Sequence, residues 1–305
     1  MRQDKRQDET QDDFAGWAGL VQAQMEEALD SFLPQPGQVP SSLHEAMRYA
    51  VLDGGKRVRP LLVFAAGELV KAPPAALASA AAAVEMIHAY SLVHDDMPCM
   101  DDDELRRGKP TVHVKFGEAM ALLAGDALQA QAFMVLAGGA GSAPNRLAMV
   151  SLLASAAGSA GMCGGQAIDL ASVGVALSLP ELEQMHRLKT GALLRASVLL
   201  GALCGSDSLG GPERAALEAY SNAVGLAFQV VDDVLDATAD SQTLGKTAGK
   251  DAQDNKPTYV SMLGLEQSRA LAAQLRNEAH AAVAMWGEDA IRLRQLADLI
   301  VHRKA

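Results

Sequence analysis

The densest group of chemically active residues in the sequence is an acidic stretch. Six carboxylates fall within the ten positions from Asp95 to Glu104, and two arginines follow almost at once. Like charges this close repel, so the stretch needs cations. Asp95 and Asp101 would point to different sides of a straight helix, but Pro98 interrupts the helix and allows both to reach one point. Converging carboxylates suit Mg²⁺, which takes a few protein oxygens and leaves its other positions to water and substrate phosphates.

A second acidic cluster lies in the segment FQVVDDVLD, residues 228–236. Its Gln229, Asp232, Asp233 and Asp236 follow the spacing i, i+3, i+4, i+7 and so share one helix face. The residues before them are apolar, as expected for a helix that enters an interior cavity. One aspartate cluster is weak evidence, whereas two that are far apart in sequence strongly indicate a metal-assisted site.

The helix that leads into the first cluster carries a polar stripe. Glu85, His88, Ser91 and Asp95 recur at steps of three, three and four, so they lie on one face. Alanine and larger apolar residues occupy the other faces, which predicts burial all round rather than a solvated surface stripe. Buried carboxylates need partners, so this stripe is a candidate part of the site.

Basic residues gather in the breaks between the predicted helices. They lie in GGKRVRP (residues 54–60), at Arg106 and Arg107, and in GKTAGKD with the lysine that follows it (residues 245–256). Arginine binds phosphate oxygens in a bidentate way, and lysine supplies a point charge. An acidic chain, of net charge -11, that keeps its cations in loops is therefore expected to bind an anionic substrate.

Helical runs of about 15–25 residues alternate with Gly- or Pro-rich breaks, and no strand pattern stands out. The content of 49% hydrophobic but only 4% aromatic residues favours closely packed helices. We predict an all-α fold, one large helical bundle, over residues 14–305, after a disordered polar tail at residues 1–13. Residues 147–168 carry no charge but are rich in Ala, Gly and Ser, so they predict a packed interior helix and no membrane span.

Charge and cysteine content narrow the surroundings of the protein. The net charge of -11 disfavours nucleic acid and acidic membranes as partners, because both call for a basic surface. The three cysteines are irregularly spaced and odd in number, which favours a reducing compartment. A cytoplasmic location is therefore expected.

Taken together, these motifs resemble those of the trans-isoprenyl diphosphate synthases, and within that family those of the bacterial farnesyl diphosphate synthases. The resemblance covers nearly the whole chain after the tail. The motifs that carry it are GGKRVRP (54–60), DDMPCMD with the following RR (95–107), GMCGGQAID (161–169), KTG (189–191), FQVVDDVLD (228–236) and GKTAGKD (245–251).

The resemblance implies an isoprenoid synthase fold, a helical bundle around a deep central cavity. It also implies that the two aspartate motifs face each other across the mouth of this cavity. The implied ligands of Mg²⁺ are Asp95, Asp96, Asp101, Asp232 and Asp236. The residues implied to bind isopentenyl diphosphate are Gly55, Lys56, Arg59, His88 and Arg107. Those implied to bind the allylic diphosphate are Arg106, Lys189, Thr190, Gln229, Lys246 and Lys256, of which Lys189, Thr190 and Gln229 are also the candidate catalytic residues.

By the same resemblance, isopentenyl diphosphate condenses head to tail with dimethylallyl or geranyl diphosphate, and a homodimer is expected. Tyr90 and Ser91 lie just before Asp95 and are candidates for the floor that limits product length. A geranylgeranyl diphosphate synthase would carry the same catalytic motifs and remains an alternative. A terpene cyclase would lack the second aspartate cluster, and a non-catalytic partner subunit would have lost one of the two clusters; both are intact here.

Overall fold

The computed structural model describes residues 2–175, 177–205, 210–238 and 257–303. Within these ranges the chain is almost entirely helical, which confirms the all-α prediction. The helices are α1 (Arg2–Phe32), α2 (Ser41–Val51), α3 (Val58–Leu69), α4 (Pro74–Asp95), α5 (Val112–Phe116), α6 (Glu118–Gly138), α7 (Ala143–Ala157), α8 (Met162–Ala171), α9 (Leu179–His186), α10 (Ala192–Leu203), α11 (Gly211–Thr238), α14 (Tyr259–Leu263), α15 (Leu265–Ala282) and α16 (Ile291–His302), with a π-helical turn η1 (Arg187–Gly191) and a 3₁₀ segment η2 (Ala284–Ala290).

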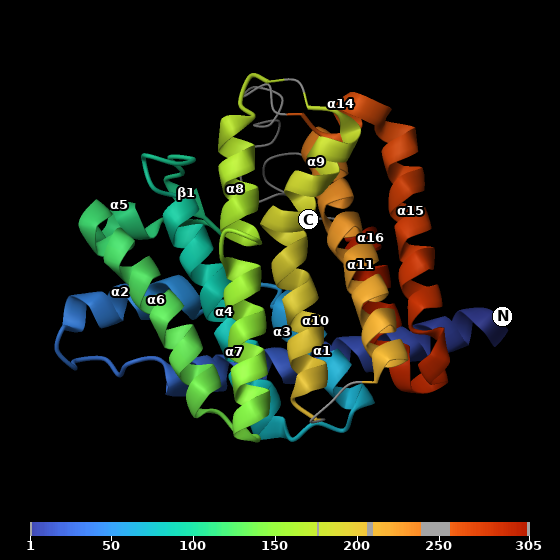
Figure 1. Ribbon diagram of the computed structural model, residues 1–305, viewed down its shortest axis with the longest axis horizontal. Coiled ribbons are helices and arrows are strands. Elements are labelled where there is room, and N and C mark those ends of the chain that lie inside the picture. The colour runs from blue at the N-terminus through green and yellow to red at the C-terminus, as the bar shows by residue number, and fades with distance from the viewer. Residues whose placement is uncertain (1, 176, 206–209, 239–256, 304–305) are drawn as a thin grey trace.

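The long helices stand side by side, and α1 crosses behind them (Figure 1). Helix α4 lies at the centre, where it packs against α6, α3 and α10. Its alanine tract, residues 80–83, is fully buried, and these small side chains allow the neighbouring helices to approach closely. Glu85 is also buried, at 3% exposed, so the polar stripe of this helix does lie inside the protein, as predicted.

Most helix boundaries fall at the predicted Gly and Pro breaks, but the uncharged stretch at residues 147–168 is divided. Helix α7 ends at Ala157 and α8 begins at Met162. The chain turns so tightly between them that a Cβ on Gly161 would lie 2.2 Å from the carbonyl oxygen of Ala156. The prediction of one interior helix was therefore wrong, because glycines at both ends of the turn permit a break that hydropathy does not reveal.

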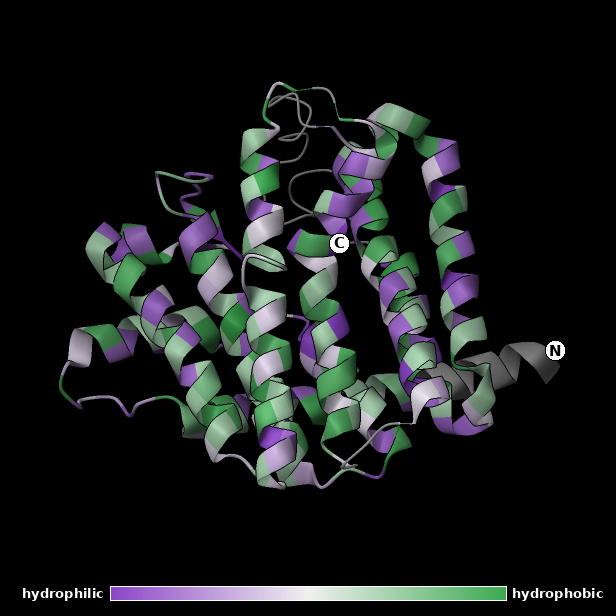
Figure 2. Cartoon of the chain, in the orientation of Figure 1, coloured by the Kyte–Doolittle hydropathy of each residue, from purple (hydrophilic) through white to green (hydrophobic). Residues whose placement is uncertain are grey.

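Among the residues that the structure describes, three helical stretches are long and apolar enough to cross a membrane, judged by length and composition alone. The first, Pro74–Asp95, is 78% buried within the fold. The other two are Glu118–Gly138, at 39% buried, and Ala143–Ala171, at 33% buried. Much of α6 and α7 thus faces outward, and Figure 2 shows mostly apolar residues along both helices.

A short hairpin, which the sequence pattern does not reveal, follows the first acidic cluster. Strand β1 (Leu105–Arg106) pairs antiparallel with β2 (Lys109–Pro110), in the register Leu105 to Pro110. Arg107 and Gly108 both have positive φ, which suits the two-residue turn of a hairpin. The turn separates the two arginines, so that they reach different parts of the site.

Helix α1 includes residues 2–13, for which the sequence predicts a disordered tail. Helix propagation from the packed part of α1 needs no new nucleus, so a polar segment of good helix formers can extend it. An ion pair of 2.9 Å between Asp13 and Arg292 of α16 lies at the start of this packed part.

Candidate active site

The first acidic cluster forms a loop that folds back on the end of α4. The amide of Asp101 donates a hydrogen bond of 2.8 Å to the carbonyl oxygen of Asp95, and the amide of Asp103 donates one of 3.2 Å to that of Asp96. Asp95 and Asp101 are therefore neighbours. Burial raises the pKa of Asp95 to about 6; nearby Lys189 opposes the rise, and Asp101 adds to it. A buried carboxylate in this state favours the approach of a cation.

The second residue of this cluster, Asp96, is already paired within the protein. It is 3% exposed and accepts hydrogen bonds of 2.8 Å from Nε and 2.5 Å from Nη2 of Arg106. This bidentate pair ties the hairpin to the end of α4 and fixes the position of the arginine. Asp96, a predicted metal ligand, and Arg106, which is predicted to bind the allylic diphosphate, thus form an ion pair with each other.

Lys189 and Thr190 lie in the π-helical turn η1. A π-bulge changes the direction of successive side chains and is frequent at functional sites. Both residues line the same cavity as Asp95. Close contact with α8 fixes the turn, because a Cβ on Gly165 would lie 2.1 Å from the backbone nitrogen of Lys189.

The Lys189 ammonium lies 2.5 Å from the carboxylate of Asp169 on α8. Burial disfavours the charge on Lys189, but Asp169, with smaller contributions from Asp95 and Asp101, outweighs that effect and raises the pKa of Lys189. The lysine is therefore charged, aligned by one carboxylate and close to the acidic loop. This is the arrangement that a diphosphate-binding cation needs.

Helix α11 places its polar residues in two directions. The Thr190 hydroxyl donates a hydrogen bond of 3.3 Å to the Gln229 side-chain oxygen, so these two predicted residues are brought together. Gln229 in turn donates one of 3.1 Å to Asp233. Asp233 is 4% exposed and also accepts a 2.8 Å bond from the amide of Tyr259, so it anchors α14 and positions Gln229. Asp236 is half-buried one turn further along.

Asp232 lies 2.7 Å from the guanidinium of Arg303, at the end of α16. Its negative charge also favours the charged forms of Lys56 and Arg59, against the effect of burial on their pKa values. The pKa of Lys56 is lowered by burial first and then by Arg303. The second aspartate cluster therefore faces the basic loop that precedes α3.

That loop borders a cavity of about 860 Å³, which we call the basic cavity. Gly55 has a φ of +108°, and a Cβ there would lie 2.5 Å from Nη1 of Arg107. The same arginine nitrogen donates a 2.9 Å bond to the Gly54 carbonyl oxygen. The glycine pair thus provides a backbone surface against which the Arg107 guanidinium lies flat, beside Lys56.

Arg57, in the same loop, has a structural role. It is 4% exposed and donates bonds of 2.7 Å to Glu85 and 3.1 Å to Glu26. Glu85, from the polar stripe of α4, therefore holds the basic loop in place.

A second cavity, of about 580 Å³, lies on the other side of Arg59 and His88, and we call it the apolar cavity. Arg59 and His88 border both cavities, so the two meet at these side chains. Burial lowers the pKa of Arg59 to about 10. Burial, followed by Arg59 and Arg107, lowers the pKa of His88 well below its usual value, so its imidazole is neutral at pH 7.

The apolar cavity has acidic and basic residues at one end and apolar side chains along its walls. Asp95, Lys189 and Thr190 border it, as do Tyr90 and Ser91 from the preceding turns of α4. Other lining residues include Met97, Leu122, Met162 and Leu170. Such a cavity suits a molecule with an anionic head and a hydrocarbon tail.

The candidate metal ligands can be tested by their chemistry. Within the part of the chain that the structure describes, no group of three His, Cys, Asp or Glu side chains lies close enough together to hold an ion alone. Asp95 and Asp101 are nevertheless neighbouring oxygen donors, and Asp232 lies on α11 beside the basic cavity. One pair of carboxylates and one single carboxylate fit Mg²⁺, because this ion takes few protein ligands when phosphates supply the others. Lys246 and Lys256 lie outside the described residues.

Sequence reasoning missed two residues of this site. Asp169, which aligns Lys189, is part of the GMCGGQAID motif, so the motif was a signal for it. Arg303, which pairs with Asp232, stands near the end of the chain with no motif around it. Only the packing of α16 against α11 reveals its position.

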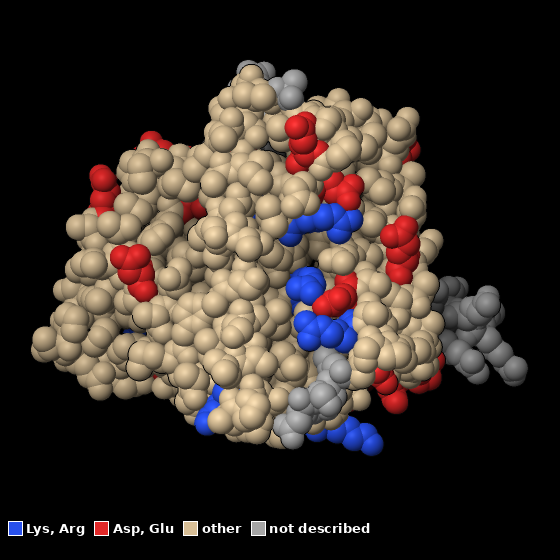
Figure 3. Space-filling view, in the orientation of Figure 1, with Lys and Arg blue, Asp and Glu red and all other residues tan. Residues whose placement is uncertain are grey.

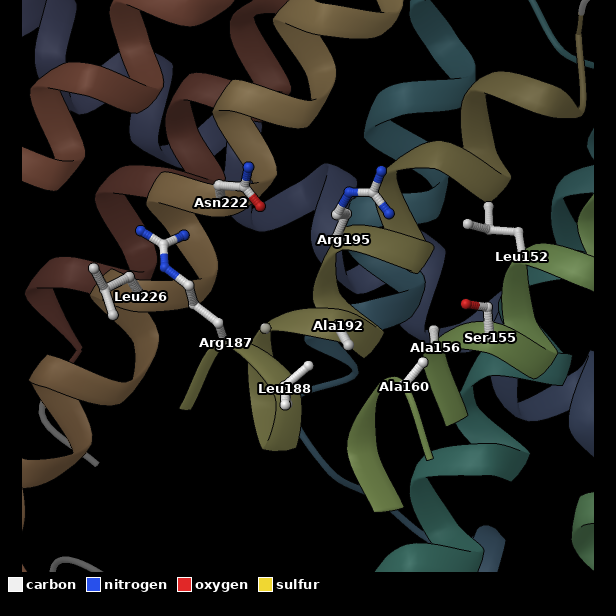
Figure 4. A pocket seen from close by; sticks show the side chains of 11 residues that line it. Leu152, Ser155, Ala156, Ala160, Arg187, Leu188, Ala192, Arg195, Asn222 and Leu226 are labelled. Carbon is white, nitrogen blue, oxygen red and sulfur yellow. The ribbon is translucent and has the colours of Figure 1, made fainter. Parts of the chain in front are cut away.

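A third cavity, of about 200 Å³, contains none of the predicted residues. Basic side chains gather near the middle of the face in Figure 3, next to acidic ones. Figure 4 shows Arg187 and Arg195 in this third cavity, with Asn222 beside them. Arg187 lies 2.6 Å from Glu183, and Arg195 lies 2.5 Å from Glu218. None of the predicted metal ligands borders this cavity, so it is a poor fit for a diphosphate that binds together with Mg²⁺.

An all-α bundle with two aspartate motifs and joined basic and apolar cavities defines the isoprenoid synthase class. A protein-family model described as Polyprenyl synthetase matches residues 40–287. The chain is 50% identical to the farnesyl diphosphate synthase of Escherichia coli, over 92% of this chain and 95% of the relative. It is 52% identical to a probable farnesyl diphosphate synthase of Sinorhizobium fredii, over 92% and 85%.

Solved structures agree. An FPP/GFPP synthase of Zymomonas mobilis superposes with a TM-score of 0.86 at 41% identity, covering 95% of this chain and 99% of that one. The chain therefore belongs to the polyprenyl synthetase family, and it is a prenyltransferase.

Proposed function

We propose that the protein condenses isopentenyl diphosphate with dimethylallyl and then geranyl diphosphate to make farnesyl diphosphate. The observation that carries this proposal is the meeting of the two cavities at Arg59 and His88. One cavity is basic, as a diphosphate requires, and the other is apolar, as a growing prenyl tail requires. The farnesyl diphosphate synthase and the probable farnesyl diphosphate synthase named above support the fifteen-carbon product.

The metal of this reaction would be Mg²⁺, which Asp95, Asp101 and Asp232 would hold, with Asp96 and Asp236 in support. When bound, it would neutralise the diphosphate and stabilise the charge that develops as the carbon–oxygen bond breaks. The raised pKa of Asp95 supports this assignment, because a cation relieves a buried and crowded carboxylate. Asp96 acts by holding Arg106 in place.

The basic residues divide between the two substrates. Arg106 and Lys189, with Lys246 and Lys256, bind the allylic diphosphate beside the acidic loop. The backbone of Gly55, together with Lys56, Arg59, His88 and Arg107, binds isopentenyl diphosphate in the basic cavity. Neutral His88 donates a hydrogen bond there without adding a further charge beside Arg59.

Thr190 and Gln229 face the carbon that becomes cationic. Their oxygen dipoles stabilise positive charge, and their mutual hydrogen bond of 3.3 Å holds both in place. The apolar walls exclude water, which would otherwise trap the cation. The double bond of isopentenyl diphosphate attacks the cation, a new carbon–carbon bond forms, and the released diphosphate accepts the proton that is lost.

The outer faces of α6 and α7 support a homodimer. Leu123, Met134 and Leu147 on these helices are 51%, 66% and 66% exposed. A second copy of the chain would cover this apolar surface. Light scattering should give twice the mass of the chain, and Met134→Glu should shift the protein toward the monomer. The location is cytoplasmic, in keeping with a reducing compartment and a water-borne diphosphate substrate.

Product analysis tests the reaction. The purified chain is incubated with labelled isopentenyl diphosphate, Mg²⁺ and either dimethylallyl or geranyl diphosphate, and the products are separated by length. We expect fifteen carbons, loss of product with a chelator, and at least ~10²-fold lower turnover for Asp95→Ala. Asp102→Asn, in the same loop, is the matched control, since Asn tolerates the positive φ of that position. Turnover of Asp95→Ala within a few-fold of wild type would overturn the metal assignment.

A further inference from the structure

Tyr90, the candidate floor of the apolar cavity, is held in place by contacts with other side chains. Tyr90 is 5% exposed and lies five residues before Asp95 on α4. Its hydroxyl is 3.5 Å from Sγ of Cys163 on α8. The phenol group therefore connects α4 to α8.

The Tyr90 hydroxyl can donate to the sulfur of Cys163, or the thiol can donate to the phenol oxygen. Helix α4 packs directly on α6, whereas α8 packs on η1, α9 and α7. The contact between Tyr90 and Cys163 is therefore a side-chain bridge across the cavity wall.

A second contact fixes the ring of Tyr90. His94 packs edge-on against it, with ring centres 5.7 Å apart and planes at 80°. His94 Nε2 lies 3.1 Å from the Leu122 carbonyl oxygen on α6. Gly125 leaves room for the imidazole, since a Cβ there would lie 2.1 Å from His94 Nε2. The tyrosine is thus held by the packing of its ring against His94 and by the contact of its hydroxyl with Cys163.

We propose that Cys163 is a positioning residue for product length, which holds the Tyr90 ring across the path of the prenyl tail. This inference rests on the proposed function and concerns the same site. A tyrosine ring can leave its place by rotating about its side-chain bonds, and a growing tail would push it aside. The contact with Cys163 opposes that rotation, so the stop after fifteen carbons depends on the hydroxyl as well as on the bulk of the ring.

Cys163 is suited to this part by its place. Its side chain is exposed and lines the cavity, whereas Cys204 is buried elsewhere. A thiol is small and weakly polar, so it meets the hydroxyl without obstructing the tail. The prenyl chain is the ligand class that this wall contacts.

The test compares Tyr90→Phe, Cys163→Ala and the double variant, each given farnesyl diphosphate, labelled isopentenyl diphosphate and Mg²⁺. Loss of one such hydrogen bond corresponds to roughly a 2- to 10-fold change in an equilibrium. We expect each single variant to raise the share of twenty-carbon product by about that factor. Condensation of dimethylallyl diphosphate should stay within about threefold of wild type. Cys163→Ser, which keeps a hydrogen-bonding group, should restore the stop at fifteen carbons.

The double variant distinguishes two explanations for a longer product. Either Cys163 holds the Tyr90 ring in place, which we call the clamp, or its removal only enlarges the cavity. If Cys163 acts through the Tyr90 hydroxyl, Cys163→Ala adds nothing once Tyr90 is Phe. If it merely frees volume, the effects of the two substitutions add, and the proposal is overturned. Cys99→Ser removes a different thiol from the same cavity and should leave product length unchanged.

The wild-type product separates this inference from the proposed function. A wild type that stops at twenty carbons overturns the proposed product, and the clamp is then read as a shift from twenty to twenty-five carbons. A wild type that stops at fifteen carbons, with both single variants unchanged, overturns the clamp alone.

Discussion

The guanidinium of Arg303 lies 2.7 Å from the Asp232 carboxylate, so the last turn of α16 is tied to the second aspartate motif. The same nitrogen donates a 2.7 Å bond to the Phe228 carbonyl oxygen, and the guanidinium lies 3.9 Å from the centre of the Phe228 ring. Any metal ion that uses Asp232 must therefore compete with a positive charge that is already in place.

Replacing Arg303 should ease metal binding. In Arg303→Gln, we expect the Mg²⁺ concentration for half-maximal activity to fall by about two- to tenfold, since one partly exposed charged pair is lost. Activity is titrated with Mg²⁺ at saturating isopentenyl diphosphate, because Arg303 also borders the basic cavity. Arg294→Gln, on the same helix but bonded to the Gly287 carbonyl oxygen, is the control. An unchanged Mg²⁺ requirement would show that the pair does not compete with the metal.

The two substrates should respond to different cations. Arg59→Ala should raise the KM for isopentenyl diphosphate at least ~10-fold more than the KM for the allylic substrate, because Arg59 borders the basic cavity. Lys246→Ala should show the opposite bias. Steady-state kinetics with each substrate varied in turn measures this, with Lys71→Ala on an exposed turn as control. Equal effects on both substrates would contradict the division.

The sequence predicts which segments form the site better than it predicts the role of each charged residue in it. Pro98 indicates the bend that makes Asp95 and Asp101 neighbours. The basic loop contains three cations in four positions, and nothing local tells which is buried. All three border the basic cavity, but the structure shows that Arg57 is the buried one, because its guanidinium pairs with Glu85 and Glu26.

The features of the site that the sequence does not predict depend on contacts between distant segments. Lys189 and Asp169 lie twenty positions apart on either side of a break, and the π-helical turn that aims the lysine has no propensity signal. The hairpin at Leu105 has strands of two residues, too short to show an alternating pattern. Both depend on tertiary packing, which a single sequence does not encode locally.

Gly165 should be essential for activity because of its contact with η1. In Gly165→Ala, the new methyl group would lie 2.1 Å from the Lys189 nitrogen and 2.5 Å from its Cα, so α8 and η1 must separate. A displacement of about 1 Å at a positioning residue can lower turnover by ~10²-fold. We expect at least a tenfold loss of kcat, with helical content by circular dichroism preserved. Gly138→Ala, where a Cβ meets nothing within 4 Å, should keep full activity. Wild-type kcat in Gly165→Ala would show that η1 has more freedom than the packing indicates.

His186 should make the fold sensitive to acid. It is 7% exposed, stacks on Tyr259 with ring centres 5.7 Å apart, and neither ring nitrogen has a hydrogen-bond partner among the described residues. Burial lowers its pKa to about 4, from about 6.5 in an unfolded chain. The unfolded state therefore binds more protons between these values. The stability that neutral His186 contributes is present above pH 6.5 and is lost as the pH falls toward 4.

For this one group the loss between pH 7 and pH 5 is about 2 kcal/mol. His186→Phe keeps a ring against Tyr259 and removes the titrating nitrogens, so its free energy of unfolding should fall less over that range. Urea unfolding at both pH values measures the difference, and His302→Phe, at the exposed end of α16, serves as control. If wild type and His186→Phe lose equal stability between pH 7 and pH 5, the acid sensitivity arises from other groups.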